Sequence, residues 1–285
     1  MIPAQFDYCA PTSVGEAVSA LSEAGEDAKV LGGGQSLLPM LRLRLSVPTV
    51  LVDLRKVDEL RGVREDGDVL VIGAMTRHAD VIEDPLVRQY AALVAEATAT
   101  VADPAVRHRG TFGGALAHAD PAGDLPAVAL ALDAELVIEA PAGRRTVAAA
   151  DFFQDYLQTV LAPDEVLVEV RLPKLDRSWG VAYEKFSRVA QAWAVVGVAA
   201  AVRRDNGSIA EARVGLTNMG STPVRASTTE QALAGGDASP AVIATAAGHA
   251  ADGTAPPADL GGQPDYRAHL ARVLTRRAVA AAART

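Results

Sequence analysis

Cysteine is nearly absent from this 285-residue chain, and its scarcity excludes several kinds of site. The single thiol, Cys9, cannot form an internal disulfide, hold a structural zinc ion or ligate an iron–sulfur cluster. The five histidines are scattered, and none stands in a metal-ligand pair at helical or hairpin spacing. No Ser-His-Asp or Cys-His arrangement is evident either. We therefore expect no metal ion and no catalytic side chain in this chain.

Long basic runs and long apolar runs are also missing. The formal net charge is −8 and basic residues alternate with acidic ones, so nucleic acid is not an expected partner, because phosphate binding needs clustered Lys and Arg. The richest apolar stretch, residues 194–202, is too short to span a bilayer, and the first residues lack the charged and apolar regions of a signal peptide. These features predict a soluble, cytoplasmic protein, with association at the inner face of the membrane left open.

Aromatic residues make up only 4% of the chain while 49% of it is hydrophobic, so we expect a core of alanine, valine and leucine. The Ser-x-x-Glu pattern at 13–16 predicts a helix over 13–24 that ends at Gly25. Hydrophobic periodicity predicts further elements on both sides of a boundary near 174–180. The other predicted helices are 37–45, 86–101, 125–132, 240–251 and 265–284. The predicted strands are 28–31, 50–52, 69–72, 136–138, 166–172, 181–187, 194–202 and 209–217.

A strand that runs into three glycines is the first feature with a chemical meaning. Residues 29–36 read Lys-Val-Leu-Gly-Gly-Gly-Gln-Ser. Consecutive glycines let the backbone approach a ligand closely and turn its N–H groups inward, which suits a phosphate group. The spacing is neither that of a P-loop nor that of a Rossmann dinucleotide fingerprint. On its own, the pattern is equally typical of a flexible turn between a strand and a helix.

A second pair of glycines stands in a long polar segment, residues 103–124, which shows little periodicity. The segment contains Thr-Phe-Gly-Gly at 111–114, and Asp-Pro-Ala-Gly-Asp-Leu-Pro follows at 120–126. We expect a loop here, and loops of this length are usually functional. Asp124 precedes an apolar helix, so the local alternative for this residue is a structural N-cap. His108 and His118 flank the glycines and are expected to form loop hydrogen bonds, not to act as catalysts.

Together, the two glycine motifs, about 80 residues apart, resemble those of the FAD-binding subunits of molybdenum hydroxylases. That family includes aerobic carbon monoxide dehydrogenases and the flavin domain of xanthine dehydrogenase. The resemblance covers nearly the whole chain and extends to Glu-Val-Leu at 165–167, Arg-Leu-Pro at 171–173, Tyr-Glu-Lys-Phe at 183–186 and Gly-Leu-Thr-Asn-Met-Gly at 215–220.

The resemblance implies an α+β fold of two parts. The first is a two-subdomain FAD-binding domain of the PCMH/VAO-like kind over residues 1–176, with subdomains at about 1–54 and 55–176. The second is a smaller α+β C-terminal domain over residues 177–285. The FAD would lie between the two subdomains of the first part.

The resemblance also assigns roles to individual residues of the two loops. The first loop would wrap the diphosphate and the adjoining ribose of FAD with Lys29, Leu31, Gly32, Gly33, Gly34, Gln35 and Ser36. The second loop, on the phosphate side, would consist of Thr111, Gly113, Gly114 and Ala115. Many relatives have Asn where this chain has Ala115, so a side-chain contact is lost there.

Further positions would surround the flavin ring. Asp124 would accept hydrogen bonds from hydroxyl groups on the flavin side, and Lys185 would lie near the polar edge of the ring. Val166 or Leu167 would pack on the ring. Trp193 would cover it, although a Trp in the hydrophobic core is an equally good interpretation of this residue.

The function implied is electron transfer. In this family a large subunit oxidises the substrate at a molybdenum centre, a small subunit passes the electrons through two iron–sulfur clusters, and the FAD subunit delivers them to an external acceptor such as a quinone. A dimer of heterotrimers is expected, and Gln35 and the segment 188–197 look closest to carbon monoxide dehydrogenase flavoproteins. The alternatives are a self-contained flavin oxidase or dehydrogenase and a non-enzymatic nucleotide-binding module.

Overall fold

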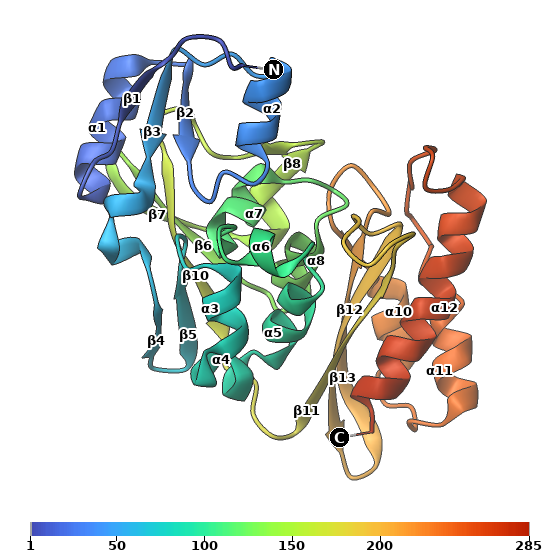
Figure 1. The fold of residues 1–285 in the computed structure, drawn as a ribbon. Helices are drawn as coiled ribbons and strands as arrows, with labels where there is room; N and C mark the ends of the chain where they lie inside the picture. The colour runs from blue at the N-terminus through green and yellow to red at the C-terminus, as the bar shows by residue number, and fades with distance from the viewer. Residues whose placement is uncertain (1, 285) are drawn as a thin grey trace.

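The N-terminal part of the chain is a small parallel sheet with a helix packed against it (Figure 1). The computed structural model describes residues 2–284. The strands, in order across the sheet, are β1 (Asp7–Cys9), β3 (Val50–Asp53) and β2 (Ala28–Leu31). The helices and 3-10 turns that follow these strands are α1 (Val14–Ala24), α2 (Leu37–Leu43), η1 (Leu54–Lys56) and η2 (Asp58–Leu60).

Helix α1 begins as its capping pattern predicts, with one change of partner. The Ser13 hydroxyl accepts the N–H of Glu16 at 3.2 Å, as in a capping box. The Glu16 carboxylate accepts instead from the N–H and the hydroxyl of Thr12, at 2.8 and 2.9 Å. The helix ends before Gly25, whose φ of +74° and ψ of −160° are a backbone conformation that glycine adopts readily and other residues rarely do.

A five-stranded antiparallel sheet follows, and helices in the centre of the molecule cover one of its faces, where the largest hydrophobic core lies (Figure 1). Its strands, in order, are β4 (Val63–Asp66), β5 (Val69–Gly73), β10 (Val166–Pro173), β6 (Glu135–Ala140) and β7 (Gly143–Ala148). The helices of this part are α3 (His78–Glu83), α4 (Pro85–Tyr90), α5 (Ala92–Ala99), α6 (Pro104–Arg107), α7 (Phe112–His118), α8 (Asp124–Ala131) and α9 (Ala149–Phe152). A short hairpin, β8 (Phe153–Asp155) and β9 (Gln158–Thr159), lies between β7 and β10 in the chain.

The C-terminal part is a second antiparallel sheet with helices on its outer face, shown in orange and red in Figure 1. Its strands are β11 (Trp179–Phe186), β12 (Val196–Asp205), β13 (Ser208–Thr217) and β14 (Val224–Arg225). The outer helices are α10 (Ser227–Leu233), α11 (Pro240–Ala247) and α12 (Pro264–Ala282). Within residues 2–284, no helix has the length and apolar character needed to cross a membrane.

Helix α8 joins the two parts, because it packs on the inner face of the C-terminal sheet. A Cβ atom on Gly215 of β13 would lie 2.2 Å from the Ala127 carbonyl oxygen of α8, so the absence of a side chain permits this approach. All eight residues of α8 are buried, as expected for a helix held between two layers.

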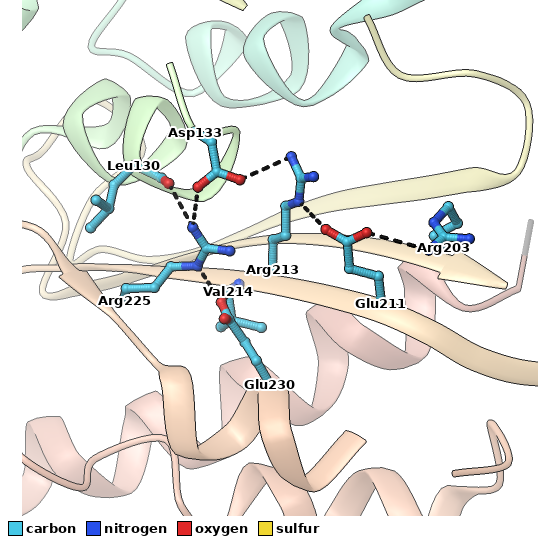
Figure 2. Close-up of polar contacts among 8 residues, drawn as sticks. All are labelled: Leu130, Asp133, Arg203, Glu211, Arg213, Val214, Arg225 and Glu230. Carbon is cyan, nitrogen blue, oxygen red and sulfur yellow. Dashed lines mark hydrogen bonds and ion pairs between the residues drawn. The ribbon is translucent and has the colours of Figure 1, made fainter. Parts of the chain in front are cut away.

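A cluster of ion pairs fastens the far end of α8 to the same sheet (Figure 2). Asp133, which follows α8, accepts from Arg225 at 2.7 Å and from Arg213 at 3.1 Å. Arg225 also donates to the Leu130 carbonyl at 3.0 Å and pairs with Glu230. Arg225 thus places a cationic side chain on one of the last carbonyls of the helix, which suits the partial negative charge of the helix end.

Most predicted elements are confirmed, and the predictions that the structure contradicts lie between residues 86 and 124. The predicted helix over 86–101 is two helices, α4 and α5, that meet at Ala91, whose φ of −143° and ψ of 45° are not helical. The predicted loop over 103–124 is wrong, because it contains α6 and α7. The N-cap interpretation of Asp124 is also wrong: Gly123 is the N-cap of α8 and Asp124 lies in its first turn.

Replacing Arg225 by Met should lower the free energy of unfolding by about 2–4 kcal/mol, because the change removes the cationic partner of the Glu230 carboxylate, which is only 16% exposed, and one of the donors to the Leu130 carbonyl. The matched control is Arg203→Met, since Arg203 is 38% exposed and lies 3.4 Å from Glu211; it should cost less than about 1 kcal/mol. Urea unfolding followed by circular dichroism measures both. Equal losses in the two variants would contradict the role assigned to the cluster.

Candidate cofactor site

A cavity of about 710 Å³ lies where the N-terminal sheet, the central helices and the C-terminal sheet meet. Its walls come from the β2–α2 loop, from residues 101–126, from residues 157–167 before and at the start of β10, and from residues 185–193 after β11. This size is within the range of about 300–1,000 Å³ typical of small-molecule sites. Every residue that the sequence suggested for the cofactor lines this cavity except Leu31. The Leu31 side chain packs against Gly34, where a Cβ atom would lie 3.3 Å from Leu31 Cδ1.

The two glycine loops touch each other through their backbones. A Cβ atom on Gly33 would lie 2.2 Å from the Arg109 carbonyl oxygen and 2.6 Å from the Gly110 Cα. Gly113 of the second loop is equally crowded, because a Cβ atom there would lie 2.4 Å from the Cβ atom of Ala74. The glycines are therefore required first by contacts within the protein, and not only by the approach of a ligand.

The two loops differ in what their N–H groups do. Within the described chain, the N–H groups of Gly33, Gly34, Gln35 and Ser36 donate to no protein atom. In the second loop, by contrast, Gly113 donates to the Ala74 carbonyl at 2.8 Å. The N–H of Gly114 is likewise engaged, at 3.2 Å from the Thr111 hydroxyl. Only the first loop thus offers a row of free backbone donors, which is the arrangement that binds phosphate oxygens.

Cationic side chains reach the cavity at two places. Lys29 lies on β2 beside the first loop, and its ammonium forms no ion pair within residues 2–284. Lys185 lies on β11 and is almost fully buried, with its Nζ 2.8 Å from Asp124 Oδ2 and 3.0 Å from the Thr100 carbonyl. An ammonium has three N–H donors, so Lys185 keeps one for a ligand.

Asp124 is engaged on both carboxylate oxygens. Lys185 holds Oδ2, and the Tyr183 hydroxyl donates to Oδ1 at 2.7 Å. Burial raises the pKa of the Asp124 carboxyl above its usual value, while the Lys185 charge and the two hydrogen bonds act in the opposite direction. A ligand hydroxyl at Asp124 would have to share these oxygens with the protein. The room for Tyr183 comes from Gly197, where a Cβ atom would lie 2.5 Å from the Tyr183 hydroxyl.

Apolar groups supply the remaining wall. Val166 and Leu167 both line the cavity at the start of β10, next to an irregularity in the β10–β6 pairing between Leu167 and Glu169. Val166 packs with the core of the N-terminal sheet and Leu167 with the core of the central helices, so the two residues reach the cavity from opposite faces of β10. Trp193 also lines the cavity and is 56% exposed, so its interpretation as a core residue is wrong.

Sequence reasoning missed several residues of this site. His78, Met75, Gly110 and Leu157 line the cavity although no motif singled them out. Of these four, only Gly110 could have been suspected from the sequence, because it directly precedes Thr111 of the second glycine motif. Of the two histidines considered earlier, His118 lines the cavity, with its Nε2 3.9 Å from Asp120, and His108 does not.

Known families match the chain over both of its parts. Residues 4–175 match the family described as the FAD binding domain in molybdopterin dehydrogenase. The chain belongs to this family. Residues 181–282 match a second family, the CO dehydrogenase flavoprotein C-terminal domain. These matches confirm the family, the fold and the FAD cofactor that the two glycine motifs predicted.

Individual relatives resemble this FAD-binding subunit over its full length. The carbon monoxide dehydrogenase medium chain of Hydrogenophaga pseudoflava is 43% identical, covering 99% of this chain and 98% of that one. The 6-hydroxypseudooxynicotine dehydrogenase complex subunit alpha of Paenarthrobacter nicotinovorans is 38% identical, covering 99% and 96%. The solved carbon monoxide dehydrogenase from H. pseudoflava lacking the Mo-pyranopterin moiety gives a TM-score of 0.97 at 45% identity, covering 99% and 98%.

The polar and apolar groups that line the cavity fit the two chemically different ends of FAD. The amides of 33–36 and the Lys29 ammonium, which have no partner among the described residues, suit a diphosphate, and the apolar wall at Leu167 and Trp193 suits a flat ring. When bound, FAD supplies the redox chemistry, and the protein supplies orientation and electrostatics.

Gly33→Ala tests the contact between the loops. Its Cβ atom meets the Arg109 carbonyl, so the first loop should shift in the flavin-free protein to relieve the overlap. Binding FAD would then restore this overpacking, which costs about 1–3 kcal/mol, so FAD affinity should fall roughly 5- to 150-fold. Gly15→Ala is the control, because Gly15 lies in α1 with nothing near its Cβ position, and it should bind FAD like the wild type. Fluorescence titration of the flavin-free protein measures both affinities. Wild-type affinity in Gly33→Ala would contradict the assignment.

Proposed function

We propose that this chain is the FAD-carrying electron-transfer subunit of a molybdenum hydroxylase complex, and that it does not bind the substrate. The observation that carries the proposal is the row of four amides at Gly33–Ser36, which have no hydrogen-bond partner within residues 2–284 and lie at the cavity beside the second glycine loop. In our assignment the FAD diphosphate lies on these amides. The flavin ring lies between Leu167 and Trp193, with Lys185 at its polar edge.

Partner subunits follow from the names of the relatives. "Medium chain" and "complex subunit alpha" denote members of multi-subunit enzymes, so we infer a larger and a smaller partner for this chain as well. We propose that the larger one carries molybdenum and the smaller one iron–sulfur clusters, in a dimer of heterotrimers. We further propose a quinone as the external electron acceptor.

An exposed apolar rim supports docking of the electron donor at the cavity. Leu157 and Trp193 line the cavity and are nevertheless 40% and 56% exposed. Tyr156, beside Leu157 in the β8–β9 hairpin, is 65% exposed. Exposed aromatic and apolar groups that gather at a site mark protein contacts, and we assign this rim to the iron–sulfur subunit.

Carbon monoxide is our proposal for the substrate of the complex, on the basis of the 43% identity to a carbon monoxide dehydrogenase medium chain. The relative named for 6-hydroxypseudooxynicotine is nearly as similar, at 38%. Relatives that differ in substrate but match over the whole chain fit a division of labour in which the substrate binds on another subunit.

The isolated chain should hold FAD and oxidise neither carbon monoxide, aldehydes nor purines. Its visible flavin absorption should bleach anaerobically when the reduced iron–sulfur subunit is added, because electrons enter from that partner. Co-expression with the two partner genes, followed by size exclusion and metal analysis, should give one complex that contains FAD, iron and molybdenum.

Two results would contradict this proposal. A flavoprotein that eluted alone and oxidised a substrate unaided would favour a self-contained oxidase. A colourless chain that bound adenine nucleotides as well as it bound FAD would favour a nucleotide-binding module.

A further inference from the structure

His78 is a buried polar residue that the proposed electron transfer does not employ. It begins α3, its backbone N–H donates to the Gly110 carbonyl at 2.9 Å, and it is only 3% exposed. Its Nδ1 is fully buried and has no hydrogen-bond partner within the described chain, whereas its Nε2 keeps some accessibility. Because His78 lines the cavity, Nε2 is the ring nitrogen that reaches it.

Gly110 leaves this nitrogen uncovered. A Cβ atom at Gly110 would lie 2.8 Å from His78 Cδ2 and 3.1 Å from Nε2, so any side chain there would press on the edge of the ring. Gly110 is also the residue against which Gly33 packs. The open edge of the imidazole therefore lies next to the first glycine loop, where the free amides are.

The environment fixes which nitrogen carries the proton. Burial, reinforced by the charge of Arg107, lowers the pKa of His78 to about 4, so the ring is neutral near pH 7. A neutral imidazole has one N–H donor. A proton on Nδ1 would be a buried donor without an acceptor, which is costly, so we assign it to Nε2. His78 thus presents a single uncharged donor to the cavity.

We propose that His78 is a further cofactor-binding residue, which donates a hydrogen bond from Nε2 to a phosphate oxygen of the FAD held on the first glycine loop. This inference rests on the proposed function, since it needs a dinucleotide in the cavity. The phosphate is the part of FAD that we assign to the neighbouring amides, and it offers only acceptor oxygens. A neutral donor adds direction to the site without adding charge.

His78→Leu tests the proposal in the full chain freed of flavin. Loss of one hydrogen bond to a charged group should weaken FAD binding about 10- to 100-fold in a fluorescence titration. The orphaned Nδ1 means that the same change removes no internal hydrogen bond, so the melting temperature of the flavin-free protein should not fall. His78→Gln can place an amide N–H near the position of Nε2 and should recover most of the affinity.

Gly110→Ala is an independent variant, because it covers Nε2 and leaves the histidine in place; it should also weaken FAD binding. FAD affinity equal to that of the wild type in His78→Leu would overturn this inference alone. A second result would also overturn it: His78→Leu and His78→Gln bind FAD equally weakly, and both have a lowered melting temperature. That result would indicate a structural role for His78. A wild-type chain that bound no FAD would overturn the proposed function, and this inference with it.

Discussion

The contact between the two glycine loops is the constraint on which the rest of the site depends. Gly33 lies so close to the backbone at Arg109 and Gly110 that no side chain fits between them. This contact joins the small parallel sheet to the central helices and fixes the orientation of the first loop. Because its N–H groups then find no partner in the described chain, they stay available to a ligand. Gly110, which takes part in this contact, also adjoins the buried ring of His78.

Helix α8 carries the second constraint, because it is held at both ends by the C-terminal sheet. At its start, Asp124 is bound by Lys185 and Tyr183 of β11. At its end, Asp133 is bound by Arg213 and Arg225, as Figure 2 shows. A buried ion pair contributes little net stability but is costly to break, so the Lys185–Asp124 pair fixes position more than it stabilises. The C-terminal part is therefore a structural component of the cofactor cavity, to which it contributes Lys185 and the rim.

The fold was predictable from sequence where local chemistry decides the structure. The Ser13 cap, the stop at Gly25 and the long apolar strands of both antiparallel sheets follow from composition and period. The short strands β1 and β4 were missed, since strands of three or four residues with exposed side chains carry no periodic signal. Helix α7 was taken for a loop because two glycines open it; its start is fixed by the Thr111 cap and by the Ala74 backbone, which lies far away in sequence.

The candidate site was likewise predictable where local sequence decides it, and not where contacts between distant elements decide it. Glycine spacing and a family resemblance indicated both loops, but they could not show that only the first has free amides, since this depends on the partners of the second. Nor could they show Tyr183 at Asp124, or His78 behind Gly110, because these contacts join residues from elements distant in the chain.

Amide hydrogen exchange of the chain with and without FAD, resolved residue by residue by NMR, tests most directly the claim that the first loop binds the diphosphate. The account predicts fast exchange at Gly33–Ser36 in the flavin-free protein and strong protection there once FAD is bound. The amide of Gly113, already bonded to Ala74, should change little. Slow exchange at Gly33–Ser36 before FAD is added, or unchanged exchange after it binds, would contradict the account.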